Sequence, residues 1–215
     1  MLRSIHLSNG VEPQTPVKFL PPNSNAQGLI VFDEVAYAAT ANCNGAASGV
    51  WALDLASKQI SNWQPSSGAI AGSAGPAFGP DGTVYATTTS GQLVALEPKT
   101  LTVKETNSTD GLGFASSPVV FPFKGRNVVA AATKDGRILL FDGAALGSKP
   151  LVETPAYYGM AFDSGALATW QAIDGVRWLL VPGIGAPTPG SGFSDGNGAV
   201  THGAIVAWKI GRAHV

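Results

Sequence analysis

The chain has 215 residues, with 13 Lys and Arg against 14 Asp and Glu, and a formal net charge of −1. Without a basic cluster it lacks the electrostatic footprint that nucleic acid or an anionic membrane requires, and its longest apolar runs fall short of the ~18 residues of a spanning helix. The charged fraction of only 13%, with 27 Gly and 15 Pro, is typical of many short strands joined by tight turns and favours an all-β protein.

The first 26 residues contain no strong strand signal. They lack the apolar core and the small-residue cleavage site of a signal peptide. Residues 1–26 are instead expected to be the remnant of a preceding repeat followed by a Pro-rich connector.

From residue 27 onward the chain repeats one pattern four times. Each copy contains two strand-like runs separated by a turn, and the first runs start at residues 35, 83, 127 and 177, so the copies are 48, 44 and 50 residues apart. Periods of roughly 40 to 50 residues are typical of propeller blades. The paired runs are Val35–Thr40 with Gly49–Leu55, Thr83–Thr88 with Gln92–Glu97, Asn127–Thr133 with Arg137–Asp142, and Arg177–Gly183 with Gly203–Lys209.

A further strand-like run precedes every pair, and another follows the first three pairs. Four consecutive antiparallel strands per copy form a meander. The preceding runs are rich in Gly, Ala and Ser, as expected where wedge-shaped sheets converge on a common axis, and the pairs are apolar on both faces, as expected between neighbouring sheets. The sequence therefore predicts β-propeller blades at about 27–64, 68–106, 111–154 and 158–209. A β-sandwich with chance similarity among its hairpins is the alternative, and a solenoid fits less well.

The end of the first copy, "WALDLASKQISNW", resembles the repeat of pyrroloquinoline-quinone-like (PQQ-like) β-propellers. In that family a blade ends with Ala-x-Asp, a Thr-Gly-Lys-like turn and a Trp that docks between blades. The matching residues here are Ala52, Asp54, Ser57, Lys58 and Trp63. The second copy keeps only the middle of this signature, and the third has "LLFDGAALG" in its place.

The resemblance implies one of two functions. The family includes non-enzymatic members, among them an outer-membrane-assembly lipoprotein, and quinoprotein alcohol dehydrogenases that hold a quinone, a calcium ion, a catalytic Asp and adjacent cysteines. This chain has a single cysteine, Cys43, and no acidic set that aligns with the calcium ligands. We therefore expect a non-catalytic, extracytoplasmic or periplasmic scaffold that binds protein or a small ligand at its rim or funnel. The alternative is a fragment of a PQQ- and calcium-dependent dehydrogenase.

Both ends of the chain suggest a piece of a larger ring. The last six residues, "IGRAHV", have no counterpart in any copy and match the translation of a common sequencing adapter, so residues 210–215 are expected to be non-native. The partial propeller would then span residues 1–209 of a seven- or eight-bladed ring. A four-bladed ring is the alternative, since propellers run from four to eight blades.

No residue is assigned to catalysis, to a cofactor or to a metal. The acids that recur at the ends of the third strands, Asp54, Glu97 and Asp142, are interpreted as turn formers that accept backbone N–H bonds. A metal site from His6 and His202 is disfavoured, and His214 belongs to the non-native tail. Three glycine-rich half-motifs lack the third glycine and the helix of a dinucleotide site.

One long irregular segment, Gly183–His202, interrupts the fourth pair. Loops of this length are usually functional or disordered. Asp195 and Asn197 could offer oxygens to Ca²⁺, but the loop lacks the acidic density of calcium sites, which favours a flexible loop. Asn107 begins an "NST" triplet that matches a glycosylation acceptor by pattern alone.

Overall fold

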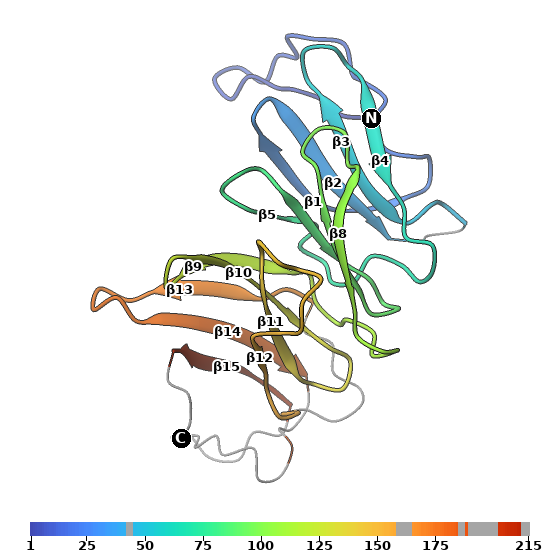
Figure 1. Ribbon diagram of the computed structural model, residues 1–215. Helices are drawn as coiled ribbons and strands as arrows, with labels where there is room; N and C mark the ends of the chain where they lie inside the picture. The colour runs from blue at the N-terminus through green and yellow to red at the C-terminus, as the bar shows by residue number, and fades with distance from the viewer. Residues whose placement is uncertain (42–44, 158–164, 185–187, 189–201, 212–215) are drawn as a thin grey trace.

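The computed structural model of the chain describes residues 1–41, 45–157, 165–184, 188 and 202–211. Over these residues every regular element is a β-strand, so the all-β prediction is confirmed. The strands form four antiparallel sheets in chain order, which we call blades one to four (Figure 1). None of the described residues forms a helix long and apolar enough to cross a membrane.

Three blades have four strands and blade four has three, each strand pairing with its neighbour in sequence. Blade one contains β1 (Asn25–Phe32), β2 (Val35–Ala41), β3 (Gly49–Asp54) and β4 (Ile60–Trp63). Blade two contains β5 (Ala77–Phe78), β6 (Val84–Thr87), β7 (Gln92–Leu96) and β8 (Val103–Ser108). Blade three contains β9 (Val119–Phe123), β10 (Arg126–Ala132), β11 (Ile138–Asp142) and β12 (Val152–Glu153). Blade four contains β13 (Ala168–Gln171), β14 (Arg177–Ile184) and β15 (Gly203–Ile210). All four predicted pairs are therefore confirmed.

Tight turns join the strands within a blade. Asp33 and Glu34 link β1 to β2 with φ angles of 47° and 59°, which is the two-residue geometry whose twist matches the flanking strands. After β3 and β7 the turns contain Lys58 and Lys99, with φ angles of 62° and 63°. The position equivalent to Lys58 in blade two is Leu101, with a φ angle of 55°, because the N–H of each donates to the backbone O of the acid that ends the third strand.

The core lies between the blades. Val35, Tyr37 and Val50 of blade one pack against Val84 and Val94 of blade two. Equivalent apolar clusters join blade two to blade three and blade three to blade four. The two middle strands of blades one to three are buried on both faces for this reason, which confirms the sandwiched-strand prediction.

Trp63 and the N-terminal segment cover the two faces of blade one. Trp63 packs against the cluster shared by blades one and two, so its predicted docking role is confirmed. On the opposite face, Phe19 packs against Ala36 and Leu53, together with Leu2, whose backbone pairs with that of Val17 across the N-terminal segment. This segment therefore stands where a preceding blade would pack.

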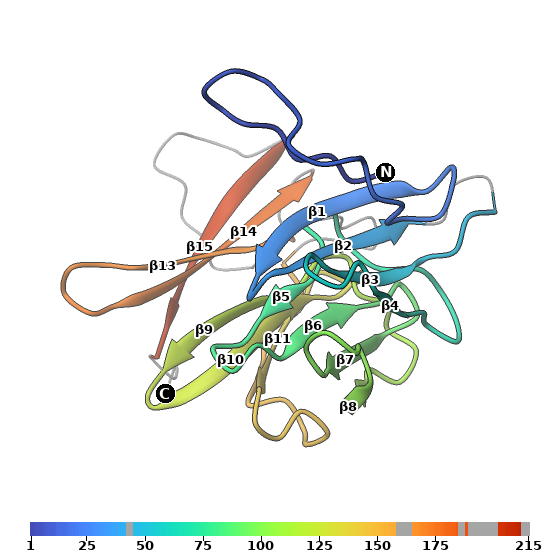
Figure 2. The same cartoon turned by 90° about the horizontal axis from the view of Figure 1, so that it is seen from above.

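Small residues lie where the segments leading into the blades converge. A Cβ atom on Gly72 would lie 1.9 Å from the backbone N of Ser117 and 2.3 Å from the backbone O of Gly165. That same oxygen accepts hydrogen bonds from the backbone N of Ser73 (3.1 Å) and of Ser117 (3.0 Å). Backbones of the segments that lead into blades two, three and four therefore meet at one point. Figure 2 shows the four blades from above.

Candidate functional site

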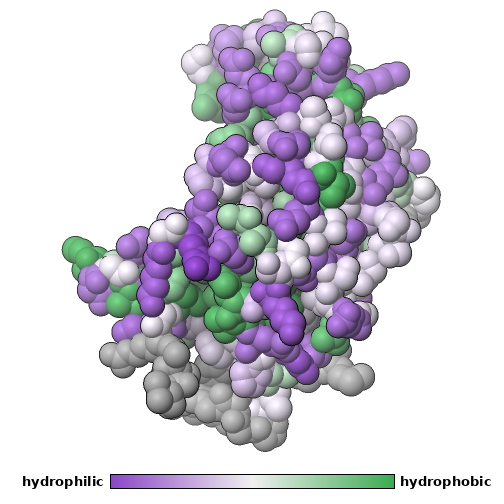
Figure 3. All heavy atoms as spheres, in the orientation of Figure 1, coloured by the Kyte–Doolittle hydropathy of each residue, from purple (hydrophilic) through white to green (hydrophobic). Residues whose placement is uncertain are grey.

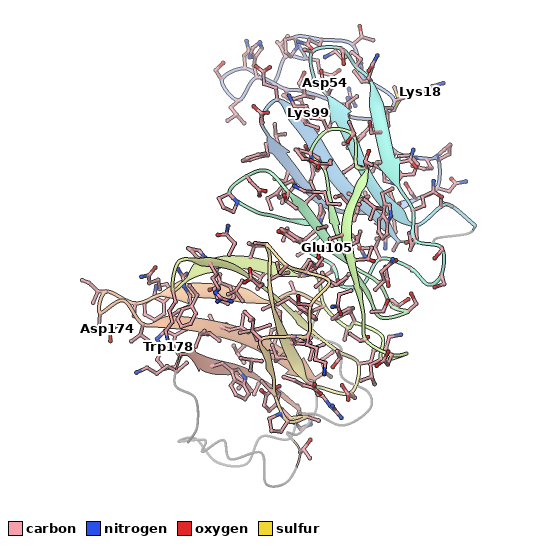
Figure 4. All side chains as sticks on the ribbon, viewed as in Figure 1. Lys18, Asp54, Lys99, Glu105, Asp174 and Trp178 are labelled. Atoms are coloured by element: carbon pink, nitrogen blue, oxygen red, sulfur yellow. The ribbon has the colours of Figure 1, made fainter. Side chains whose placement is uncertain are left out.

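Two of the three recurring acids serve as turn formers. The Asp54 carboxylate accepts hydrogen bonds from the backbone N of Ser57 (2.7 Å) and of Ala56 (3.0 Å). The Asp142 carboxylate accepts one from the backbone N of Ala144 (3.0 Å). The bond from Ser57 is the main reason why the pKa of Asp54 lies below its ordinary value. The prediction made for Asp54 and Asp142 is confirmed, and Figure 4 shows Asp54 at the end of its strand.

The third acid, Glu97, does not cap its turn, so the prediction made for its side chain is wrong. Its carboxylate lies 3.8 Å from Lys104 Nζ, while its backbone O accepts a bond from the N of Leu101 (3.0 Å). The N–H that a cap would use, that of Lys99, donates instead to Tyr37 Oη of blade one (3.1 Å). A contact between blades therefore replaces the local cap.

Tyrosines at one repeat position connect successive blades. Tyr37 Oη accepts the bond from Lys99 in blade two, and Tyr85 Oη donates to the backbone O of Gly143 in blade three (3.1 Å). Tyr37 pairs with Ala52, two residues before Asp54, and Tyr85 pairs with Ala95, two residues before Glu97. The two tyrosines therefore occupy the same position in the repeat. Burial raises the pKa of Tyr85 to about 12. Blade three has Ala130 at this position.

Blade two docks on blade three through a polar pair where blade one uses Trp63. The Glu105 carboxylate accepts bonds from the backbone N of Leu146 and of Gly147, both 2.8 Å. Asn107 Nδ2 donates to the backbone O of Leu146 and of Ser148, both 2.9 Å. We call these four bonds the Glu105–Asn107 clasp, and Figure 4 shows Glu105 near the junction of blades two and three.

The clasp gives Asn107 a structural role. Its amide is partly buried and donates both hydrogens to the loop after β11. Sequence reasoning missed the clasp because it joins residues about forty positions apart. The recurrence of Tyr37 and Tyr85, in "VAYAAT" and "TVYATT", was visible in the sequence, whereas their partners in the next blade were not.

The predicted metal and loop candidates are only partly described. His6 is exposed and lies in the N-terminal turn that its backbone closes. Among the residues that the structure describes, no three His, Cys, Asp or Glu side chains form a group that could hold a metal ion. Cys43, Asp195, Asn197 and His214 lie outside the described residues, as does most of the segment Gly183–His202.

Among the described residues, large apolar side chains are exposed on β1 and on blade four. On β1, the side chains of Leu29 and Val31 are each 59% exposed. On blade four, Trp170 is 57% and Ile205 71% exposed. In Figure 3 the broadest hydrophobic areas of the displayed face lie in its lower half, over blades three and four. These surfaces are the candidate binding surfaces of the described chain.

Comparison with solved structures identifies the architecture. The structure of BamB from Moraxella catarrhalis matches 83% of this chain with a TM-score of 0.54 and 15% identity. A quinohemoprotein alcohol dehydrogenase from Comamonas testosteroni matches 80% with a TM-score of 0.55 and 14% identity. The chain has the fold of a PQQ-like β-propeller. The predicted propeller architecture is therefore confirmed.

The chain spans less than half the length of the solved structures it matches. It covers 47% of the BamB chain and 31% of the dehydrogenase chain. No protein-family model and no curated protein match its sequence. The two structural matches are equally good and of low sequence identity. They therefore establish the fold and do not assign a function.

Proposed function

We propose that this chain is part of an extracytoplasmic PQQ-like propeller that works as a binding or assembly scaffold without catalysis. One observation carries the proposal: three carboxylates of the blades accept hydrogen bonds from backbone N–H groups. Asp54 and Asp142 bind turn backbone, and Glu105 binds the backbone of the next blade. A carboxylate that accepts two backbone N–H bonds is held in place and ionised, which suits a scaffold better than proton transfer.

The proposal includes the size of the ring. Four blades account for less than half of either matched chain. Blade four leaves apolar side chains exposed, such as Trp170 and Ile205, whereas apolar side chains of the middle blades are buried between neighbours. Both observations support a ring of seven or eight blades, in which residues 1–209 form one part.

The dehydrogenase alternative is favoured by the match to the Comamonas structure. A calcium ion in such a site takes six to eight oxygen ligands. Within the described part of the chain no three acidic or imidazole side chains form a group that could hold a metal ion, so these residues do not fit a calcium site.

The two functions are separated by an activity assay on exported protein. The chain is expressed behind a periplasmic signal, and the osmotic-shock fraction is supplied with pyrroloquinoline quinone, Ca²⁺, an alcohol and an artificial dye acceptor. We expect soluble protein in that fraction and dye reduction equal to the blank without protein. Dye reduction that saturates with quinone and needs Ca²⁺ would instead establish the dehydrogenase.

A further inference from the structure

A short turn in the N-terminal segment contains an asparagine followed by a glycine. The backbone N of His6 donates to the O of Val11 (2.9 Å), and the backbone N of Gly10 donates to the O of His6 (2.8 Å), so the turn is closed by its own bonds. Asn9 and Gly10 are exposed, and in Figure 2 the first residues form a dark blue loop that extends away from the blades. The turn therefore presents the Asn9 side chain to solvent.

The Asn9 side chain is held against the backbone of this turn. Its Oδ1 accepts a hydrogen bond from the backbone N of Val11 (3.0 Å). An asparagine oxygen that binds the N–H two residues ahead brings its Cγ atom alongside the N of the residue between, here Gly10. The same bond polarises the Cγ carbonyl, because a donor at that oxygen stabilises the negative charge that develops on it during attack. The amide is thus positioned for attack by the Gly10 N.

Gly10 leaves the path of this attack open. It has a φ angle of 71°, and a Cβ atom placed on it would meet no atom within 4 Å apart from its chain neighbours. Without a side chain, Gly10 does not shield its own N from the neighbouring amide. Among the described residues Asn9 is the only asparagine followed by glycine, while Asn44 and Asn197 share this sequence and lie outside those residues.

Two turns of the blades show that the fold accepts an aspartate in this arrangement. Asp81 Oδ1 accepts a hydrogen bond from the backbone N of Thr83 (3.2 Å). Asp174 Oδ1 accepts one from the backbone N of Val176 (3.0 Å). In both turns the intervening residue is a glycine with positive φ, 83° and 81° respectively. Asn9 is therefore the amide form of a turn that elsewhere contains a carboxylate.

We propose that Asn9 is a site of spontaneous modification, at which the side-chain amide is converted to a carboxylate through a cyclic imide. The Gly10 N loses its proton to a base in the solvent and forms a bond to Asn9 Cγ, the Cγ–Nδ2 bond breaks, and Nδ2 leaves as ammonia. Water then opens the ring at Cγ to give aspartate, or at the backbone carbonyl to give isoaspartate. The inference goes beyond the scaffold role and does not depend on it.

The two products act differently on the N-terminal segment. Aspartate keeps the backbone and repeats the turn of Asp81, so it adds one negative charge and leaves the fold unchanged. Isoaspartate routes the chain through the side chain and adds one atom to the backbone, which breaks the register of the turn. Leu2 and Val17, whose backbones pair beyond this turn, pack on blade one. The isoaspartate form should therefore loosen the cover of that blade.

Mass spectrometry of the 215-residue chain, aged in mildly alkaline buffer and digested with trypsin, tests the site. The peptide Ser4–Lys18 contains Asn9, and water enriched in heavy oxygen adds one heavy atom to each molecule that passes through the imide. We expect the native chain to convert Asn9 at least as fast as the urea-unfolded chain. Asn107 is the matched control, because its amide donates to Leu146 and Ser148. It should stay unchanged in the native chain and react only after unfolding.

Two variants separate the geometry of the turn from the bare Asn-Gly sequence. Val11→Pro removes the N–H that polarises the Asn9 amide and should slow conversion about fivefold, whereas Val11→Ile should change nothing. Gly10→Ala shields the attacking N and should slow conversion about tenfold. In case the proline variant opens the turn, the synthetic peptide Ser4–Lys18 supplies a second comparison and should convert no faster than the folded chain.

Three results would overturn the proposal. Slower conversion of Asn9 in the native chain than in the unfolded chain would show that the turn protects the amide. Equal rates for the parent chain and Val11→Pro would reduce the site to its sequence. Unchanged hydrogen exchange at the amides of Leu2 and Val17 in the isoaspartate form would refute the loosening of the cover. The dye-reduction assay is independent of all three.

Discussion

Removal of the Glu105 carboxylate should loosen the junction of blades two and three. The two bonds that Glu105 accepts are charge-assisted, and each is 2.8 Å long. Such bonds contribute about 1.5–3 kcal/mol each when buried and less when exposed. The N–H of Leu146 lies in a partly buried setting and that of Gly147 in an exposed one, so we expect Glu105→Ala to lower the free energy of unfolding by about 2–3 kcal/mol.

Urea unfolding followed by tryptophan fluorescence measures this loss, and hydrogen exchange at the amides of Leu146 and Gly147 locates it. Glu105→Gln keeps one acceptor oxygen and should lose about 1 kcal/mol. The matched control is Glu153→Ala on β12, whose carboxylate pairs with Arg137 at the surface and should contribute under about 1 kcal/mol. If Glu105→Ala and Glu153→Ala are equally mild, or if exchange at Leu146 does not change, the clasp does not hold the blades together.

Other contacts predict further changes. Because burial raises the pKa of Tyr85 to about 12 from an ordinary value near 10, the folded state holds this proton more tightly, and stability should fall as pH rises from 10 to 12. Tyr85→Phe should flatten that decline and cost about 1 kcal/mol at pH 7, measured by urea midpoints across pH. Gly72→Ala, whose Cβ would overlap two backbones, should cost about 3 kcal/mol or more, whereas Gly10→Ala, with positive φ but open space, should cost about 1 kcal/mol in thermal unfolding. Trp63→Ala should cost about 2 kcal/mol and speed exchange in blade two as well as blade one; a loss confined to β4 would refute docking between blades.

The strands could be predicted from the sequence because a strand buried between two blades requires a continuous run of apolar residues, which is visible in the local sequence. Val35–Thr40 and Asn127–Thr133 are apolar on both faces and end at turns, and both coincide with strands to within one residue. The Gly and Ser residues near Gly72 predicted convergence because only small side chains fit where backbones meet. The shortness of β5, with two residues, could not be predicted, since it depends on how closely the converging segments approach.

The contacts between blades were beyond sequence reasoning where they depend on distant partners. Glu97 and Asp54 occupy the same repeat position, yet the Tyr37 hydroxyl takes the N–H that Glu97 would have capped. The bond from Leu146 to Glu105 depends on how blade two is placed against blade three, and no local sequence pattern specifies that placement. Repetition therefore predicts the strands, while the differences between copies are resolved only in the packed structure.

The central proposal is a scaffold whose acids hold turns and one junction between blades and bind no cofactor. Calorimetric titration of the 215-residue chain with pyrroloquinoline quinone, in the presence of millimolar Ca²⁺, tests this most directly. The account predicts no saturable heat up to about 100 μM quinone, a concentration at which even a micromolar site would be filled. A one-to-one isotherm that disappears when Ca²⁺ is chelated would contradict it.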